Sequence, residues 1–187
     1  MEGDKQASPR SSIGSDDSDL MDDDAYIPPE QNMLLTDVQE THLHNEIAME
    51  LGVEYLATHS GNVSWPVAGT MFNTNARLMI HLPVRRRDGS DYKSIIFLVD
   101  TGMGFSEPRA EGASHTFLCP KAMAAVLGGM GTKASYGLHI NDAPPHPVWV
   151  SPSDSKFHDI NVMGTDFLRF ARLRVDADYE NLRFYLR

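Results

Sequence analysis

Residues 97–102 read FLVDTG, the end of an apolar run that starts at Ile95 and stops at Asp100. A short continuous apolar run predicts a buried strand. An aspartate directly after such a strand is costly to keep ionised unless something hydrogen-bonds to it or pairs with it. Thr101 supplies a hydroxyl donor, and Gly102 lets other backbone approach because it lacks a Cβ. The stretch predicts a strand that delivers a carboxylate to the bottom of a cleft, although Asp and Gly also occur together in plain turns.

The chain on either side of this stretch is typical of short strands. Residues 77–84 alternate, with Leu78, Ile80, Leu82 and Val84 on one face, and the Asp-Gly pair at 88–89 predicts a turn into the buried strand. Further strands are expected at residues 136–140, 147–150, 172–175 and 182–186, with residues 176–181 connecting the last two. Such strands, with one or two helices, predict a mostly-β domain that is closed or sandwich-like.

Two helices are expected from their terminal residues. Thr36 to Gln39 fits a capping box, and apolar residues then recur at near-helical spacing up to Gly52, which predicts one helix over residues 37–51. Pro120 suits the first position of a second helix, which Gly128 would end.

Charge and composition divide the chain. Residues 1–32 hold nine acidic and two basic side chains, a net of −7 out of −10 for the whole chain, with few large apolar groups. This segment cannot bury enough surface to offset the entropy of ordering, so we expect an acidic disordered tail. Residues 33–74 are expected to form a helical and extended extension, and residues 75–187 the main domain.

Several classes of protein are disfavoured. The chain has no apolar run near the ~20 residues that a membrane span needs, and its N-terminus lacks the pattern of a secretory signal. The acidic balance argues against nucleic acid as a partner. Cys119 is the one cysteine, which excludes a disulfide framework within the chain and a zinc site of three or four thiolates. We expect a soluble intracellular protein without a metal or another cofactor.

A second apolar strand ends in the same manner as the first. Residues 160–164 read INVMG, with Gly164 lying 64 residues after Asp100, and TDFL follows at residues 165–168. The glycine cluster GGMG occupies residues 128–131, between the two strands.

This ordered set resembles the retropepsin-like aspartic proteases, the family of retroviral, retrotransposon and related cellular proteases. Their pattern is an apolar strand ending in Asp-Thr-Gly, a glycine-containing hairpin flap, two apolar residues and Gly, often continuing as Gly-x-Asp-Phe-Leu, and an alternating C-terminal strand. Residues from about 75 to 187 follow this order. The resemblance implies a single-lobed acid-protease barrel with aspartic endopeptidase activity on peptide or protein substrates.

The resemblance also implies roles for individual residues. Asp100 matches the catalytic aspartate, and Thr101 and Gly102 match the residues that brace and turn its loop. The element packed beneath that loop is matched by Val162, Met163 and Gly164. The flap tip is matched by Gly129, Met130 and Gly131, with residues 133–137 as the alternative.

One departure from the family pattern concerns substrate binding. Met103 and Gly104 stand after Asp-Thr-Gly, where the family usually has Ala or Ser followed by Ser, Thr or Asp. A long thioether at Met103 would narrow the substrate cleft or accompany relaxed selection on activity.

The chain contains one Asp-Thr-Gly, whereas aspartic protease chemistry needs two carboxylates that share a proton around a water. An active enzyme is therefore expected to be a homodimer with Asp100 contributed twice. In the family the terminal strands interleave at the dimer interface, and Leu182, Phe184 and Leu186 would present the apolar face required. The pattern alone fits an ordinary sheet strand in a monomer equally well. Two alternatives stay open: the same fold kept as a dimerising or peptide-binding module with little hydrolysis, and an unrelated β-barrel binding protein.

Overall fold

The computed structural model describes residues 37–89, 91–101, 115–155 and 157–187, all within one compact unit that spans Leu34–Arg187. The expected acidic tail lies outside these ranges. The helices are α1 Glu40–His44, α2 Glu46–Leu51, α3 Pro120–Leu127 and α4 Thr165–Phe170. The strands are β1 Thr58–His59, β2 Val67–Phe72, β3 Arg77–Arg86, β4 Tyr92–Val99, β5 Phe117–Leu118, β6 Ser135–Ile140, β7 His146–Val150, β8 Asn161–Met163, β9 Val175–Asp178 and β10 Arg183–Leu186.

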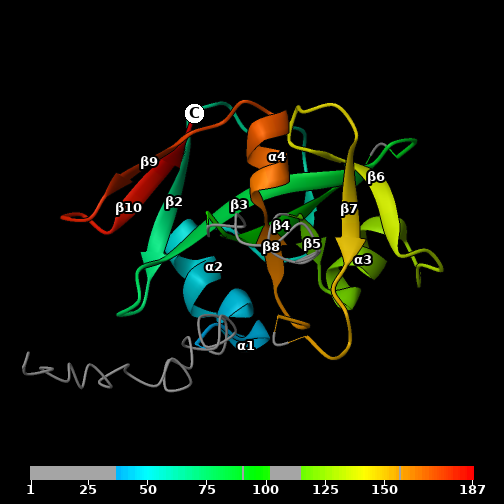
Figure 1. Cartoon of the computed structure of the whole chain (residues 1–187), viewed down its shortest axis with the longest axis horizontal. Coiled ribbons are helices and arrows are strands. Elements are labelled where there is room, and N and C mark those ends of the chain that lie inside the picture. Colours follow the sequence, from blue (N-terminus) through cyan, green and yellow to red (C-terminus); the bar gives the residue numbers. More distant parts are fainter. Residues whose placement is uncertain (1–36, 90, 102–114, 156) are drawn as a thin grey trace, which may run out of the picture. The chain divides into compact units, whose positions relative to one another are not determined.

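Six of these strands close into a barrel in the order β3, β4, β8, β5, β7, β6 and back to β3 (Figure 1). β3 and β4 form the predicted antiparallel hairpin, and β8 lies parallel to β4 on its other side. The barrel closes where β6 pairs with the end of β3, with Val84 opposite Ile140. The prediction of a mostly-β domain with few helices and a closed barrel is confirmed.

The β3–β4 hairpin is buried on both faces, which explains the continuous apolar run of β4. One face contributes Ile80, Leu82, Ile95 and Phe97 to a core cluster that also takes residues from β5–β8 and α3. The other face contributes residues to a second cluster beneath α1 and α2, namely Met79, Ile96 and Leu98. Because both faces are covered, β4 is buried up to Val99, the residue before Asp100.

The N-terminal helical segment differs from the prediction. Two short helices replace the one expected over residues 37–51, because the backbone leaves helical geometry at Asn45, with φ −119° and ψ −89°. The segment ends as predicted at Gly52, which adopts the left-handed conformation. Thr36, the expected capping residue, lies outside the described ranges, and α1 starts after Gln39, whose N–H donates to His42 Nδ1. The second expected helix is confirmed as α3, with Pro120 first and Gly128 as its left-handed cap.

The C-terminal strands also require a correction. The first lies at Val175–Asp178, later than the expected residues 172–175, because Arg172 has a φ of +57° that interrupts an extended strand. β10 is paired on both sides within the chain, to β2 and to β9. Phe184 and Leu186 are fully buried in the core of their own domain. These two residues therefore do not form the apolar face expected for a partner, whereas Leu182, the third residue of that expectation, lies before β10 and is 53% exposed.

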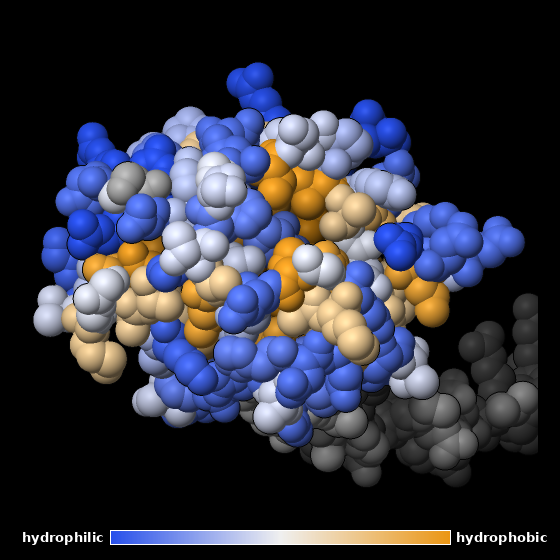
Figure 2. Space-filling view, turned by 180° about the vertical axis from the view of Figure 1, so that it is seen from behind, coloured by the Kyte–Doolittle hydropathy of each residue, from blue (hydrophilic) through white to orange (hydrophobic). Residues whose placement is uncertain are grey.

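The surface of the domain is mixed in character. On the face opposite to that of Figure 1, hydrophobic residues reach the surface in patches among hydrophilic ones (Figure 2).

Across the described ranges, the helices are too short and too polar for any of them to traverse a bilayer.

Candidate active site

Asp100 and Gly164 follow two neighbouring parallel strands at the same end of the barrel. In the register of these strands Val99 lies opposite Met163. The Asp100 amide donates a hydrogen bond to the carbonyl oxygen of Met163, at 3.0 Å, which continues the pairing by one residue. Asp100 is half-buried and Thr101 is exposed. The end of β4 therefore presents the carboxylate-bearing residue at the surface while its backbone is held by β8.

A buried polar network fixes β8 beside β4. Asn161 donates from Nδ2 to the carbonyl of Ile96 at 2.9 Å and to the hydroxyl of Tyr55 at 2.7 Å, and its Oδ1 accepts from the amide of Cys119. The Tyr55 hydroxyl lies 3.7 Å from Cys119 Sγ, which accepts from Ala122 N at the start of α3. Burial raises the pKa of the Cys119 thiol, so this side chain serves in the network as a neutral group.

The peptide group between Met163 and Gly164 is held from both sides. Its carbonyl oxygen accepts from Asp100 N, and its N–H, on Gly164, donates to Thr116 Oγ1 at 3.2 Å. Thr116 is fully buried just before β5. Its hydroxyl in turn donates to Asp166 Oδ1 at 2.7 Å.

The Asp166 carboxylate joins three segments of the chain at the start of α4. Besides the Thr116 hydroxyl, it accepts from the Thr116 amide at 3.1 Å and from His146 Nε2 at 3.2 Å. Burial opposes ionisation of this carboxyl, but the hydrogen bonds from His146 and Thr116 outweigh burial and lower its pKa. Asp166 is therefore an ionised carboxylate at neutral pH.

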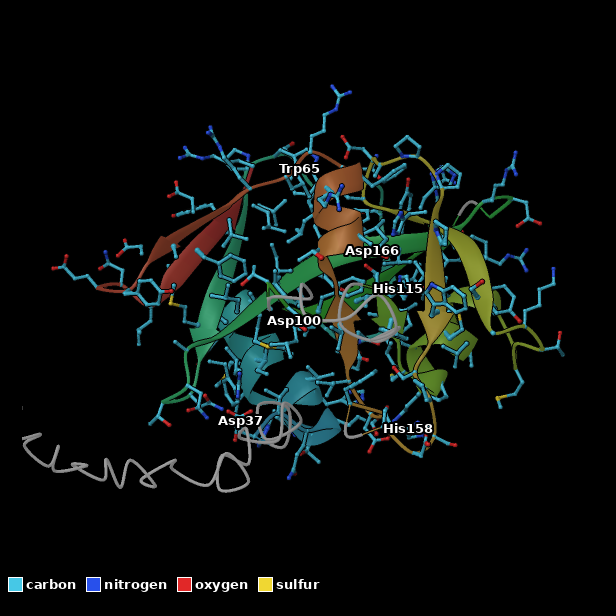
Figure 3. All side chains as sticks on the ribbon, in the orientation of Figure 1. Asp37, Trp65, Asp100, His115, His158 and Asp166 are labelled. Carbon is cyan, nitrogen blue, oxygen red and sulfur yellow. The ribbon has the colours of Figure 1, made fainter. Side chains whose placement is uncertain are left out.

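Two histidines flank Asp166. His146, the first residue of β7, is buried and packs on Phe167 and Phe170. Its Nδ1 has no hydrogen-bond partner among the described residues, so Nε2, which faces Asp166, is the ring nitrogen that holds the imidazole in place. His115 Nδ1 lies 3.6 Å from Asp166 Oδ2. Figure 3 shows Asp100, His115 and Asp166 around the region where β8 leads into α4.

The structure brings together part of the predicted site. Asp100, Thr101 and the 162–164 element lie at one end of β4 and β8, with Val162 and Met163 buried. Gly102 and Met103 lie outside the described residues.

The flap candidates Gly129, Met130 and Gly131 lie in the connection between α3 and β6, where Met130 is 84% exposed. In the shared orientation of Figures 1 and 3, this connection is at the edge of the domain and Asp100 is near its centre.

The hairpin that follows α3 is formed by β6 and β7, and its tip is anchored. Asn141 exchanges two hydrogen bonds with the backbone of Val63, and Trp65 Nε1 donates to Asp142. The alternative flap, residues 133–137, overlaps the start of β6, so it belongs to the opposite end of this hairpin from the anchored tip.

Sequence reasoning missed Thr116 and His146 and gave no role to Asp166. Thr116 lies 50 positions before Asp166 and His146 lies 20 positions before it, so no local sequence pattern connects either residue to Asp166. The available signal for Asp166 is the Gly-x-Asp-Phe-Leu continuation of the family pattern, which residues 164–168 match.

Within the described ranges, no group of three or more His, Cys, Asp or Glu side chains is arranged to hold a metal ion. A comparison with models of protein families found no match, and comparisons with curated proteins and with solved structures found no significant one.

Proposed function

We propose that the chain is a retropepsin-like aspartic endopeptidase domain that hydrolyses peptide bonds as a homodimer. The observation that carries the proposal is the parallel pairing of β4 and β8, with Asp100 N bonded to Met163 O. The family pattern packs these same two elements together, the Asp-Thr-Gly loop over the apolar-apolar-Gly strand. The closed six-stranded barrel supports the same fold.

The chemistry follows from two Asp100 carboxylates, one from each copy, on either side of a water. Two carboxylates about 3 Å apart cannot both ionise, so the pair shares one proton. The ionised member acts as general base on the water, and the protonated member polarises the scissile carbonyl. The roles exchange as the amine leaves. No metal or other cofactor takes part in this mechanism.

The dimer interface needs a surface other than the one expected from the sequence, because β10 is already paired to β2 and β9. The outer edge of β9 is a poor substitute. Antiparallel pairing of two copies there would bring Asp176 and Asp178 toward like charges, of which Asp176 is partly compensated by its ion pair with Arg187. We therefore propose an interface around the ends of β4 and β8, where Asp100 and the exposed Thr101 lie.

A second candidate function is favoured by Met103 and Gly104. A bulky thioether in place of the family's small residue suits a fold kept for dimerisation or peptide binding, with little or no hydrolysis. In either case we propose that the acidic segment 1–32 is a disordered, solubilising tail of a soluble intracellular protein.

Light scattering during size exclusion and cleavage of a peptide library between about pH 3.5 and 7 test these proposals together. We expect a dimer that cleaves, and an Asp100→Asn variant that remains a folded dimer without cleavage, because Asn cannot share the proton. A dimer without cleavage supports the binding module. A monomer without cleavage supports an unrelated barrel, and cleavage by pure Asp100→Asn removes Asp100 from the mechanism.

A further inference from the structure

A hydrogen-bonded path leads from the backbone of Asp100 to the carboxylate of Asp166. The Asp100 amide donates to the Met163 carbonyl, and the N–H of the same peptide group donates to Thr116 Oγ1. Thr116 Oγ1 then donates to Asp166 Oδ1. The plane of one peptide group thus depends on Asp100 at one edge and on Thr116 at the other.

The orientation of the Thr116 hydroxyl is determined by its neighbours. A hydroxyl has one proton to donate. Because the proton points to Asp166, a lone pair is left to accept from Gly164 N. The Thr116 amide also donates to Asp166, so the carboxylate holds the side chain and the backbone of the same residue.

His146 holds the other oxygen of the carboxylate. Its Nε2 lies 3.2 Å from Asp166 Oδ2, and its ring is fixed by contacts with Phe167 and Phe170. The carboxylate cannot rotate without losing hydrogen bonds at both oxygens, and it is largely buried. A carboxylate restrained in this manner can hold the Met163–Gly164 peptide group in a fixed orientation through its hydrogen bond with Thr116.

We propose that Asp166 is a positioning residue: acting through Thr116, it fixes the Met163–Gly164 peptide to which the Asp100 amide binds. The inference rests on the proposed function insofar as Asp100 is the catalytic residue. A small displacement of a reacting group lowers the rate of the chemical step much more than it lowers substrate binding.

Thr116→Val and Thr116→Ser separate this role from simple packing, because both preserve most of the side-chain volume and only Ser keeps the hydroxyl. Below the melting temperature of each variant, we expect Thr116→Val to lower kcat about tenfold or more with little change in KM. Thr116→Ser should stay within about twofold of the wild type. Thr70→Val is the matched control, since that hydroxyl contacts Glu50 at the surface.

The amide resonances of Gly164 and Asp100 provide a readout that does not depend on catalysis. Thr116→Val should shift the Gly164 amide proton upfield, because its hydrogen bond is lost, and should also move the Asp100 amide. Thr116→Ser and Thr70→Val should leave both in place. Asp166→Asn should move the same two resonances, and in a double variant with Thr116→Val it should cause little additional loss of kcat.

The proposal is overturned if Thr116→Val leaves the Asp100 amide unmoved, or if it moves the amide without a change in kcat. It is also overturned if Thr116→Ser loses as much kcat as Thr116→Val. Failure of the proposed function has a different signature, a folded wild type that cleaves no peptide. In that event the two amide resonances alone decide whether Asp166 positions Asp100.

Discussion

The ring of Phe184 fills the space that a side chain at Gly69 would occupy. The two residues lie directly opposite each other in the pairing of β2 with β10. A Cβ on residue 69 would lie 2.2 Å from Phe184 Cε1 and 2.7 Å from the carbonyl oxygen of Met79. The absence of a side chain at Gly69 therefore allows the C-terminal strand to close over the core.

Gly69→Ala should destabilise the domain by about 1 to 3 kcal/mol, because the aromatic ring must leave its position or the strands must separate. Urea unfolding measures the effect. Gly137→Ala in β6 is the matched control, since a Cβ there would meet its nearest atom at an ordinary 4.0 Å. Equal stability of the two variants would contradict the packing described for Phe184.

Asn161→Asp should cost about 3 to 5 kcal/mol of stability, because it places a carboxylate in a fully buried site without a countercharge. One carboxylate oxygen would face the carbonyl of Ile96, to which Asn161 now donates. Chemical denaturation at neutral pH tests this, with Asn45→Asp on the surface as the control. A loss no larger than that of the control would show that the network does not hold β8 beside β4.

The free energy of unfolding should fall on acidification because of His81. This side chain is buried against Ser94 and His59, and burial, assisted by the charge of His59, lowers its pKa to about 4. In the unfolded chain His81 takes up a proton near pH 6.5, whereas in the folded chain it does so near pH 4. The stability that is present above pH 6.5 is therefore lost as the pH falls through this range, and the loss is on the order of 2 kcal/mol by pH 5. Unfolding at pH 7 and pH 5 should show that His81→Gln removes much of this dependence and that His44→Gln does not. The same pH dependence in both variants would exclude His81 as its source.

Asp37 should anchor the start of the described domain to the β2–β3 turn. Burial opposes its ionisation, but hydrogen bonds from Asn75, Arg77 and Asn73 outweigh burial and lower its pKa. Asp37→Ala leaves the Arg77 guanidinium without this carboxylate and should cost about 1 to 3 kcal/mol at neutral pH. Deleting residues 1–32 is the control, and its composition predicts little change in melting temperature. If the deletion lowered stability more than Asp37→Ala does, residues 1–32 rather than Asp37 would anchor the domain.

The elements that could be predicted from the sequence are those whose pattern is local. β3 has apolar residues at every second position from Leu78 to Val84, β4 is continuously apolar because both of its faces are covered, and α3 has a proline at its start and a glycine at its end. β2 was not predicted, because Gly69 interrupts its apolar face and its pairing with β10 joins residues more than 100 positions apart. Burial of Phe184 follows from that same pairing.

The residues of the candidate site also fall into two groups, those that a local sequence pattern indicates and those that only the fold brings together. Asp100 and Gly164 were accessible to sequence reasoning because each ends an apolar strand. Thr116 and His146 were not, because their contacts with Asp166 depend on the closure of the barrel. A hydroxyl and an imidazole carry no pattern that would indicate which distant carboxylate they contact.

The central claim is that two Asp100 carboxylates, one from each copy, carry out peptide hydrolysis. Mixing wild-type chains with Asp100→Asn chains, under conditions of subunit exchange, and measuring peptide cleavage tests this claim most directly. Because both copies must supply a carboxylate, total activity should fall as the square of the wild-type fraction, to about a quarter when half of the chains are wild type. Activity proportional to the wild-type fraction would contradict the shared site, since each chain would then act alone.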